Sequence, residues 1–262
     1  MLRALAGGEL FGEVWGPEPA RVVALHGWRR THTDFAGVLG PDSPGGALGT
    51  LAVDLPGFGA TPAPAEGWGS GDYAEVVVRL LEGPEGPGVP AVLVGHSFGG
   101  RVAVEVAARR PDLVGGLVLT GVPLVLAGPG SGRKPAAGYR VVRTLRRFGL
   151  VGEDRLERAR QRHGSEDYRQ AQGVMREVLV RVLAERYDEA LAATTCPVEL
   201  VWGDDDTAAP LRLAEAARNR LAEATLTVCP GAGHLTPLTE APALREAVAR
   251  ALGRSPASGV AP

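Results

Sequence analysis

Short apolar runs separated by turn residues recur along the chain, and most of them are apolar at nearly every position. An uninterrupted run of this kind is typical of a strand covered on both faces, whereas a half-exposed strand alternates apolar and polar residues. The first 15 residues contain two β-rich runs on either side of Gly7 and Gly8, which predicts a hairpin. The later runs predict six more strands, at residues 21–25, 50–54, 91–95, 116–120, 198–202 and 225–229.

Segments with the periodicity of an amphipathic helix lie between many of these runs. A chain that alternates strands and helices predicts a mostly parallel sheet flanked by helices, because parallel strands are joined by right-handed crossover connections. The predicted helices cover residues 72–83, 98–112, 211–223 and 241–252.

One segment, residues 123–195, breaks this alternation, because it shows helical patterns and no clear strand. Two apolar helix faces are recognisable in it, one with Val141, Leu145 and Phe148 and one with Met175, Leu179, Leu183, Tyr187 and Leu191. We therefore predict a helical insertion at 123–195 in a sheet domain formed by 1–122 and 196–253, followed by a flexible tail at 254–262.

The composition is that of a globular chain, with 45% apolar residues in 262 and a net charge of −2. This charge gives no indication of a nucleic-acid partner. No stretch reaches the roughly 18 consecutive apolar residues of a membrane-spanning helix. The N-terminus lacks the apolar core of a secretory signal, so we expect a cytoplasmic protein without a transmembrane segment.

The two cysteines, Cys196 and Cys229, lie at opposite ends of neighbouring predicted strands. For parallel strands this places them about 16 Å apart, at 3.3 Å per residue. A disulfide requires a much closer approach of the two Cα atoms. We expect two free thiols.

Ser97 lies between Gly95 and Gly99, where a predicted strand meets a predicted helix. A serine that only caps a helix needs no glycine on both sides, and a phosphate-binding loop would end in Gly-Lys followed by Ser or Thr. A Gly-x-Ser-x-Gly turn is so sharp that side chains at the flanking positions would clash, and it exposes the serine hydroxyl at the end of the strand. Ser97 is therefore the candidate nucleophile.

A serine hydroxyl needs a general base, and the base needs an acid to hold it. His234 follows the last predicted strand and should face the same edge of the sheet as Ser97. Asp204, Asp205 and Asp206 follow the run at 198–202, and a solvated turn is the alternative interpretation of this triplet. Asp206 is favoured as the acid because Pro210 begins a helix four residues later.

The negative oxygen of a tetrahedral intermediate needs two hydrogen-bond donors. One candidate is the backbone N–H of Phe98, the residue after the nucleophile. The other is the backbone N–H of Trp28, in the loop that follows the strand at 21–25. An ordinary turn is the alternative interpretation of that loop.

Five motifs, LHGW, VDLPGFG, VGHSFGG, VWGDDDTAAP and GAGH, resemble in order and spacing the α/β-hydrolase fold superfamily. The resemblance implies eight strands with the second antiparallel to the rest, a helical cap inserted after the sixth strand, and the catalytic order Ser, Asp, His. It also implies that residues 54–59 shape a turn. The superfamily's alternative acid position falls on Gly121, Val122 and Pro123, which carry no carboxylate, and this favours Asp206.

The resemblance further implies a serine hydrolase that cleaves a small, largely apolar carboxylic ester through an acyl-enzyme and requires neither cofactor nor metal. The expected partner is the ester itself, and the chain is expected to act as a monomer or homodimer. Amides and lactones remain open as substrates. The alternatives are cofactor-independent perhydrolase or haloperoxidase chemistry, cleavage of carbon–carbon bonds, and a non-catalytic ligand-binding protein of the same fold. A serine nucleophile excludes the haloalkane dehalogenase and epoxide hydrolase branches, which use aspartate.

The predicted insertion is more basic than the rest of the chain. Residues 123–195 carry 14 Arg and Lys against 9 Asp and Glu, whereas the whole chain carries 28 against 30. A solvated arginine face is one interpretation. The other is electrostatic steering of an anionic substrate or attraction to a membrane surface.

Overall fold

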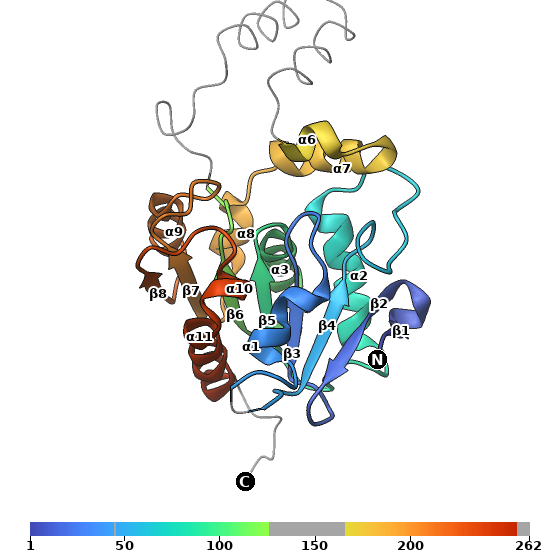
Figure 1. Cartoon of the computed structure of the whole chain (residues 1–262), viewed down its shortest axis with the longest axis horizontal. Coiled ribbons are helices and arrows are strands. Elements are labelled where there is room, and N and C mark those ends of the chain that lie inside the picture. The colour runs from blue at the N-terminus through green and yellow to red at the C-terminus, as the bar shows by residue number, and fades with distance from the viewer. Residues whose placement is uncertain (45, 126–165, 256–262) are drawn as a thin grey trace, which may run out of the picture.

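The computed structural model describes residues 1–44, 46–125 and 166–255. The described residues form one eight-stranded sheet with the strand order β1-β2-β4-β3-β5-β6-β7-β8 (Figure 1). Strand β2 is antiparallel to both of its neighbours, and all other pairs are parallel, as the resemblance to the α/β-hydrolase fold superfamily implies. The strands are β1 Arg3–Leu5, β2 Leu10–Trp15, β3 Val22–Leu25, β4 Thr50–Asp54, β5 Ala91–His96, β6 Val114–Thr120, β7 Val198–Gly203 and β8 Ala224–Cys229.

The four helices predicted outside the insertion are present, although α3 ends at Arg109 and α9 at Arg218, before their predicted ends. In the described part of the chain, three short 3-10 helices accompany them: η1 Ala6–Gly8, η2 His32–Phe35 and η3 Pro111–Leu113. The α-helices are α1 Ala36–Leu39, α2 Ser70–Glu82, α3 Phe98–Arg109, α6 Glu166–Gln170, α7 Gly173–Ala184, α8 Asp188–Ala193, α9 Leu211–Arg218, α10 Thr236–Thr239 and α11 Ala241–Arg254.

The sheet is covered on both faces, which explains why its central strands are apolar throughout. In β3, Val23 and Leu25 join the core formed with α2, α3, α8 and α9. Val22 and Ala24 point the other way, into the core formed with α1 and α11. Each of these four side chains is fully buried, so no position in the strand is left for a polar residue.

The described part of the predicted insertion forms α6, α7 and α8, between β6 and β7. The continuous apolar stripe predicted from Met175 to Leu191 is wrong, because residues between α7 and α8 leave the helical conformation and Leu183 is 53% exposed. Glu185 is extended, and its carboxylate accepts hydrogen bonds from the backbone N–H and hydroxyl of Ser70 at the start of α2. The predicted helix with Val141, Leu145 and Phe148, and most of the tail at 254–262, lie outside the described residues.

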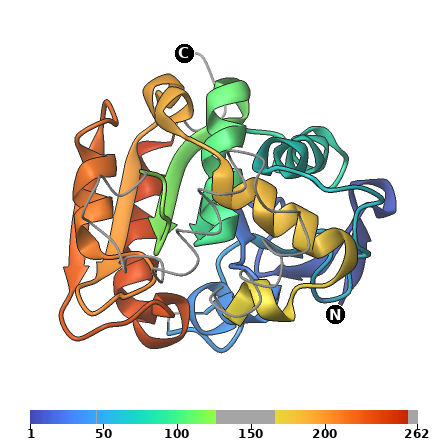
Figure 2. The same ribbon diagram turned by 90° about the horizontal axis from the view of Figure 1, so that it is seen from above.

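The register of the parallel strands brings their carboxyl ends to one edge of the sheet. Leu25 pairs with Gly95, and His96 pairs with Thr120, so the segments that follow β3, β5 and β6 begin side by side. Helices α6 and α7 lie over the loops that follow β3 and β4 at this edge (Figures 1 and 2). The two cysteines are free thiols, as predicted. Within the described ranges, no helix has the length and apolar character needed to cross a membrane.

Candidate active site

Ser97 occupies a strained turn between β5 and α3. Its φ of 49° and ψ of −109° lie outside the regions that a residue with a side chain normally adopts. A Cβ on Gly95 would collide with the backbone of Gly100, and a Cβ on Gly99 would collide with the carbonyl of Leu25 in β3. The glycines at −2 and +2 are therefore required sterically, and Ser97 stands partly exposed at the first turn of α3.

Asp206 and His234 lie together at the same edge of the sheet. The Nδ1 of His234 is 2.8 Å from Oδ2 of Asp206, and the backbone N–H groups of Ala208 and Ala209 donate to Oδ1 of Asp206 at 2.9 and 2.8 Å. Asp206 is buried, and these three hydrogen bonds fix the position of its carboxylate. No hydrogen bond joins the Ser97 hydroxyl to His234 among the described residues; such bonds are often long before substrate binds.

Gly121 gives the His234 ring its space. It follows β6 with a φ of +59°, and a Cβ there would lie 3.0 Å from both Nδ1 and Cε1 of His234. Thr120, the residue before Gly121, accepts a hydrogen bond at its carbonyl from the backbone N–H of Ser97. The turn that carries the serine is thus bonded directly to the strand end that faces the histidine.

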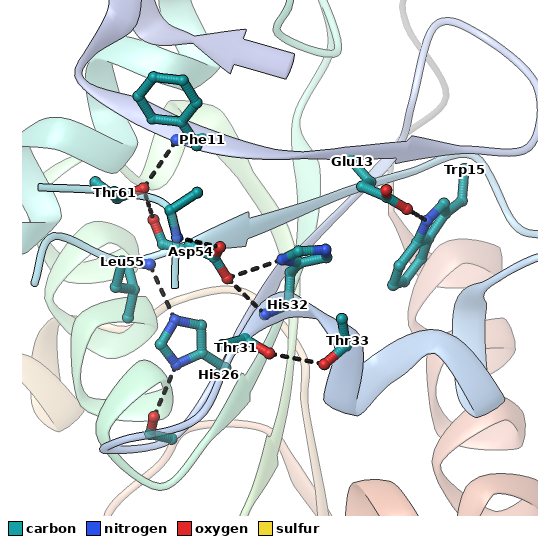
Figure 3. A network of polar contacts seen from close by, with 12 residues as sticks. Phe11, Glu13, Trp15, His26, Thr31, His32, Thr33, Asp54, Leu55 and Thr61 are labelled. Atoms are coloured by element: carbon teal, nitrogen blue, oxygen red, sulfur yellow. Dashed lines mark hydrogen bonds and ion pairs between the residues drawn. The ribbon is translucent and has the colours of Figure 1, made fainter. Parts of the chain in front are cut away.

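The two candidate oxyanion donors are available. Among the described residues, no hydrogen bond uses the backbone N–H of Trp28 or Phe98. The orientation of the Trp28 N–H is set by His26, whose Nδ1 donates to the carbonyl of Gly27 at 2.7 Å, since that carbonyl and the Trp28 N–H belong to one planar peptide. The N–H of Leu55 donates to the other ring nitrogen of His26 at 3.0 Å (Figure 3). Burial lowers the pKa of His26 to about 4, so this clamp stays neutral.

Asp54 fastens the loops that surround this region. Its carboxylate accepts hydrogen bonds from the backbone and ring of His32, at 2.8 Å each, and from the N–H of Ala60 at 2.9 Å (Figure 3). The ring hydrogen bond to Asp54 raises the pKa of His32, and the hydrogen bonds from His32 and Ala60 outweigh burial and lower the pKa of Asp54. Residues 54–59 thus have the turn-shaping contacts expected of them, and Gly59 has no room for a Cβ beside Asp54.

Apolar and aromatic groups surround the loop that carries Trp28. Its indole meets the rings of Phe58 and Phe98 edge to face, with centroids 4.9 and 5.5 Å away. It also packs against a small cluster that consists of Tyr168 of α6, Leu179 of α7 and Ala171 between these helices. Arg29, the next residue, has a φ of 56° and forms an ion pair with Asp167 of α6 at 3.7 Å. The wall beside the candidate oxyanion donors is therefore largely apolar.

Several buried polar residues received no role from the sequence, and His26, His96 and Arg101 are the ones among them that contact the loops and helices of the candidate site. Their only sequence signal is a polar residue next to a buried apolar run, at the end of a strand or inside a helix. In the described part of the chain, no group of three His, Cys, Asp or Glu side chains is arranged to hold a metal ion. A further histidine, His163 in the polar part of the predicted insertion, lies outside the described residues.

A sequence model of the alpha/beta hydrolase family matches residues 22–248. The pimeloyl-[acyl-carrier protein] methyl ester esterase of Aromatoleum aromaticum is 32% identical over 240 residues, which cover 81% of this chain and 90% of that protein. Lipase LipV of Mycobacterium tuberculosis is 37% identical over 128 residues, which cover 46% of this chain and 44% of LipV. The chain therefore spans less than half the length of that relative.

Solved structures show the same architecture. An esterase from Exiguobacterium antarcticum superposes with a TM-score of 0.70 and 20% sequence identity, over 97% of this chain and 99% of that one. A crystal structure of a membrane phospholipase A has a TM-score of 0.69 and 20% identity, over 96% of this chain and 86% of that one. At this level of identity the likeness concerns the fold.

Proposed function

Because this chain belongs to the alpha/beta hydrolase family, we propose that it is a serine hydrolase that cleaves a small, largely apolar carboxylic ester. One observation carries the proposal: a serine in a strained turn at the end of β5 shares an edge of the sheet with a hydrogen-bonded Asp–His pair. The esterases and lipases among its relatives support the same reaction class. The apolar surroundings of Trp28 support an apolar acyl group.

In the proposed reaction, the Ser97 oxygen attacks the ester carbonyl carbon while His234 removes the serine proton through Nε2. Asp206 holds the Nδ1–H of His234 and stabilises the imidazolium that forms. The carbonyl oxygen becomes negative and accepts hydrogen bonds from the backbone N–H groups of Trp28 and Phe98. Collapse of this intermediate breaks the bond to the alcohol, which leaves with the proton from His234.

The acyl-enzyme is then hydrolysed by the reverse use of the same groups. His234 removes a proton from water, the water oxygen attacks the acyl carbon, and the acid departs as Ser97 recovers its proton. Every proton passes through His234, so this mechanism requires no metal or cofactor. We further propose that residues 123–195 act as the cap that selects the acyl group, and that the protein acts in the cytoplasm.

A second candidate substrate is the methyl ester of an acyl group that is itself attached to an acyl carrier protein. It is favoured by the relatives that match most of the chain, which are pimeloyl-[acyl-carrier protein] methyl ester esterases. The excess of arginine in residues 123–195 would suit an acidic carrier. A carrier-bound methyl ester should then react with a higher kcat/KM than the same free methyl ester, and salt should reduce that advantage. Equal values at low salt would reject this candidate.

The proposed nucleophile is tested with a fluorophosphonate probe and a panel of p-nitrophenyl esters of increasing acyl length. The wild type should be labelled once, at Ser97, and should prefer short to medium acyl chains. Ser97→Ala should lose labelling and at least about 10⁴-fold in kcat. Ser43→Ala, which removes the hydroxyl of a buried serine outside the candidate site, serves as the control and should keep both. Full ester hydrolysis by Ser97→Ala would reject the proposal, and peracid formation from acetate and peroxide would favour the perhydrolase alternative.

A further inference from the structure

The ring of His96 connects the proposed nucleophile to the loop of the proposed base. His96 ends β5 and precedes Ser97, and it is only 1% exposed. Its Nε2 lies 2.9 Å from the backbone carbonyl oxygen of His234, and the two imidazole rings are 4.9 Å apart. The path from Ser97 to the backbone of His234 therefore consists of one residue and one hydrogen bond.

The partners of this ring determine which nitrogen carries the proton. A carbonyl oxygen only accepts hydrogen bonds, so Nε2 of His96 must be the donor. The Nδ1 of His96 is buried and has no hydrogen-bond partner among the described residues. It lies against Gly27, where a Cβ would come within 2.7 Å of it. Burial lowers the pKa of His96 to about 4, which agrees with a neutral ring that carries its single proton on Nε2.

We propose that His96 is a positioning residue for His234, which sets the distance of the base from Ser97 by donating its Nε2–H to the His234 carbonyl. This inference rests on the proposed function of Ser97 and His234. Since His96 and Ser97 are adjacent in the chain, a shift of the turn that carries Ser97 also moves His96 and, through its hydrogen bond, the loop that carries His234. The two reacting side chains then keep their relative position although they lie 137 residues apart in the sequence.

The unsatisfied Nδ1 argues against His96 as a simple core residue. A buried acceptor without a donor destabilises the fold, and an apolar side chain of the same size would avoid this cost. The histidine supplies what an apolar side chain cannot, a hydrogen-bond donor aimed at the base loop. It is also neutral, so it does not repel the imidazolium that forms on His234 during the proposed reaction.

The test compares His96→Met, which fills a similar volume without a donor, with His96→Gln, which keeps an N–H near the position of Nε2. His96→Met should lower kcat on the order of 100-fold with little change in KM, the effect of displacing a catalytic group by about 1 Å. His96→Gln should recover most of the loss. Equal kcat values for His96→Met and the wild type would overturn the proposal, and so would a His96→Gln variant as slow as His96→Met.

NMR of the wild type with ¹⁵N-labelled histidine provides a readout that does not depend on how a variant folds. We expect His96 as the Nε2–H tautomer without titration between about pH 5 and 8, the range in which free histidine changes charge. In His96→Met, the downfield Nδ1–H signal of His234 should broaden or shift, and in His96→Gln it should return. An Nδ1–H tautomer would overturn the proposal. Failure of the fluorophosphonate to label the wild type would instead reject the proposed function, and the tautomer measurement would still test the hydrogen bond.

Discussion

Replacing Arg101 with methionine should loosen the attachment of α7 to the helix that follows the serine. The Arg101 side chain of α3 is 8% exposed, and its Nη1 donates to the carbonyl of Val182 at 2.7 Å. Its Nη2 donates to the carbonyl of Pro123 at 3.2 Å, and its guanidinium lies 5.5 Å from the centre of the Tyr187 ring. One cation therefore holds the first residue of the predicted cap and the last turn of α7.

The size of the effect follows from these contacts. A hydrogen bond from a charged donor contributes about 1.5–3 kcal/mol, and a cation–π contact about 0.5–2 kcal/mol. Methionine removes both hydrogen bonds and leaves the carbonyl of Val182, at the negative end of a helix, with only the long hydrogen bond from the backbone N–H of Glu185 at 3.4 Å. Against this, the variant no longer buries a charge, which recovers part of the desolvation cost. We expect the free energy of unfolding to fall by about 2–4 kcal/mol.

The measurement is urea unfolding followed by circular dichroism, with Arg109→Met as the matched control on the same helix. Arg109 is 46% exposed and binds Glu75 and Glu105 at 3.1 Å each, so its loss should cost at most about 1 kcal/mol. Arg101→Lys should fall between the wild type and Arg101→Met, because an ammonium cannot reach both carbonyls in a planar fork. Equal losses for the two methionine variants would refute the reasoning.

Three further changes test other contacts. Gly121→Ala should place its Cβ 3.0 Å from the His234 ring and lower kcat while the far-UV spectrum is retained; an unchanged kcat contradicts this. His26→Phe should free the Gly27–Trp28 peptide and reduce the rate of fluorophosphonate labelling by about 10²–10³-fold, the usual effect of losing one oxyanion donor; wild-type labelling would contradict it. The His32–Asp54 pair should make the free energy of unfolding decrease both at alkaline pH and at acid pH. The contribution of His32 is complete below about pH 6.5 and is lost as pH rises through its raised pKa, while that of Asp54 is lost as pH falls through its lowered pKa. In urea unfolding at several pH values, His32→Asn should abolish the alkaline loss, and a persistent loss would contradict this assignment.

The strands were predictable from sequence because the sheet is buried on both faces. Each central strand is a short apolar run bounded by Gly, Pro or polar residues. The tight turn at Ser97 was predictable for a related reason. A Cβ on Gly99 would clash with Leu25, so only glycine fits at that position, and the sequence shows this requirement directly as a Gly-x-Ser-x-Gly motif.

The contacts of His26, His96 and Arg101 were not predictable, because each joins segments whose register is known only in three dimensions. Arg101 looks like an ordinary arginine on an amphipathic helix, and only the fold places Val182, 81 residues later, beside it. The break between α7 and α8 was not predictable for the same reason. In the sequence, the helical spacing of apolar residues continues on both sides of Glu185, and no neighbouring residue indicates that this carboxylate binds Ser70 at the start of α2.

These contacts divide the candidate site into two parts. Ser97, Asp206 and His234 are placed by strand ends and by backbone hydrogen bonds of the buried sheet, so substitutions in α6 and α7 should leave their geometry intact. Helices α6 and α7 approach the same edge through side chains, among them the pair Met175 and Gly57 and the cluster around Trp28. If Ser97 acts as proposed, residues of α7 should therefore alter which acyl group is accepted, and hence KM and chain-length preference, more than the rate of the chemical step. Arg101 belongs to both parts, since it follows the serine on α3 and holds the end of α7. Its replacement should consequently change the ratio of the kcat values for long and short acyl chains, which are measured at saturating substrate.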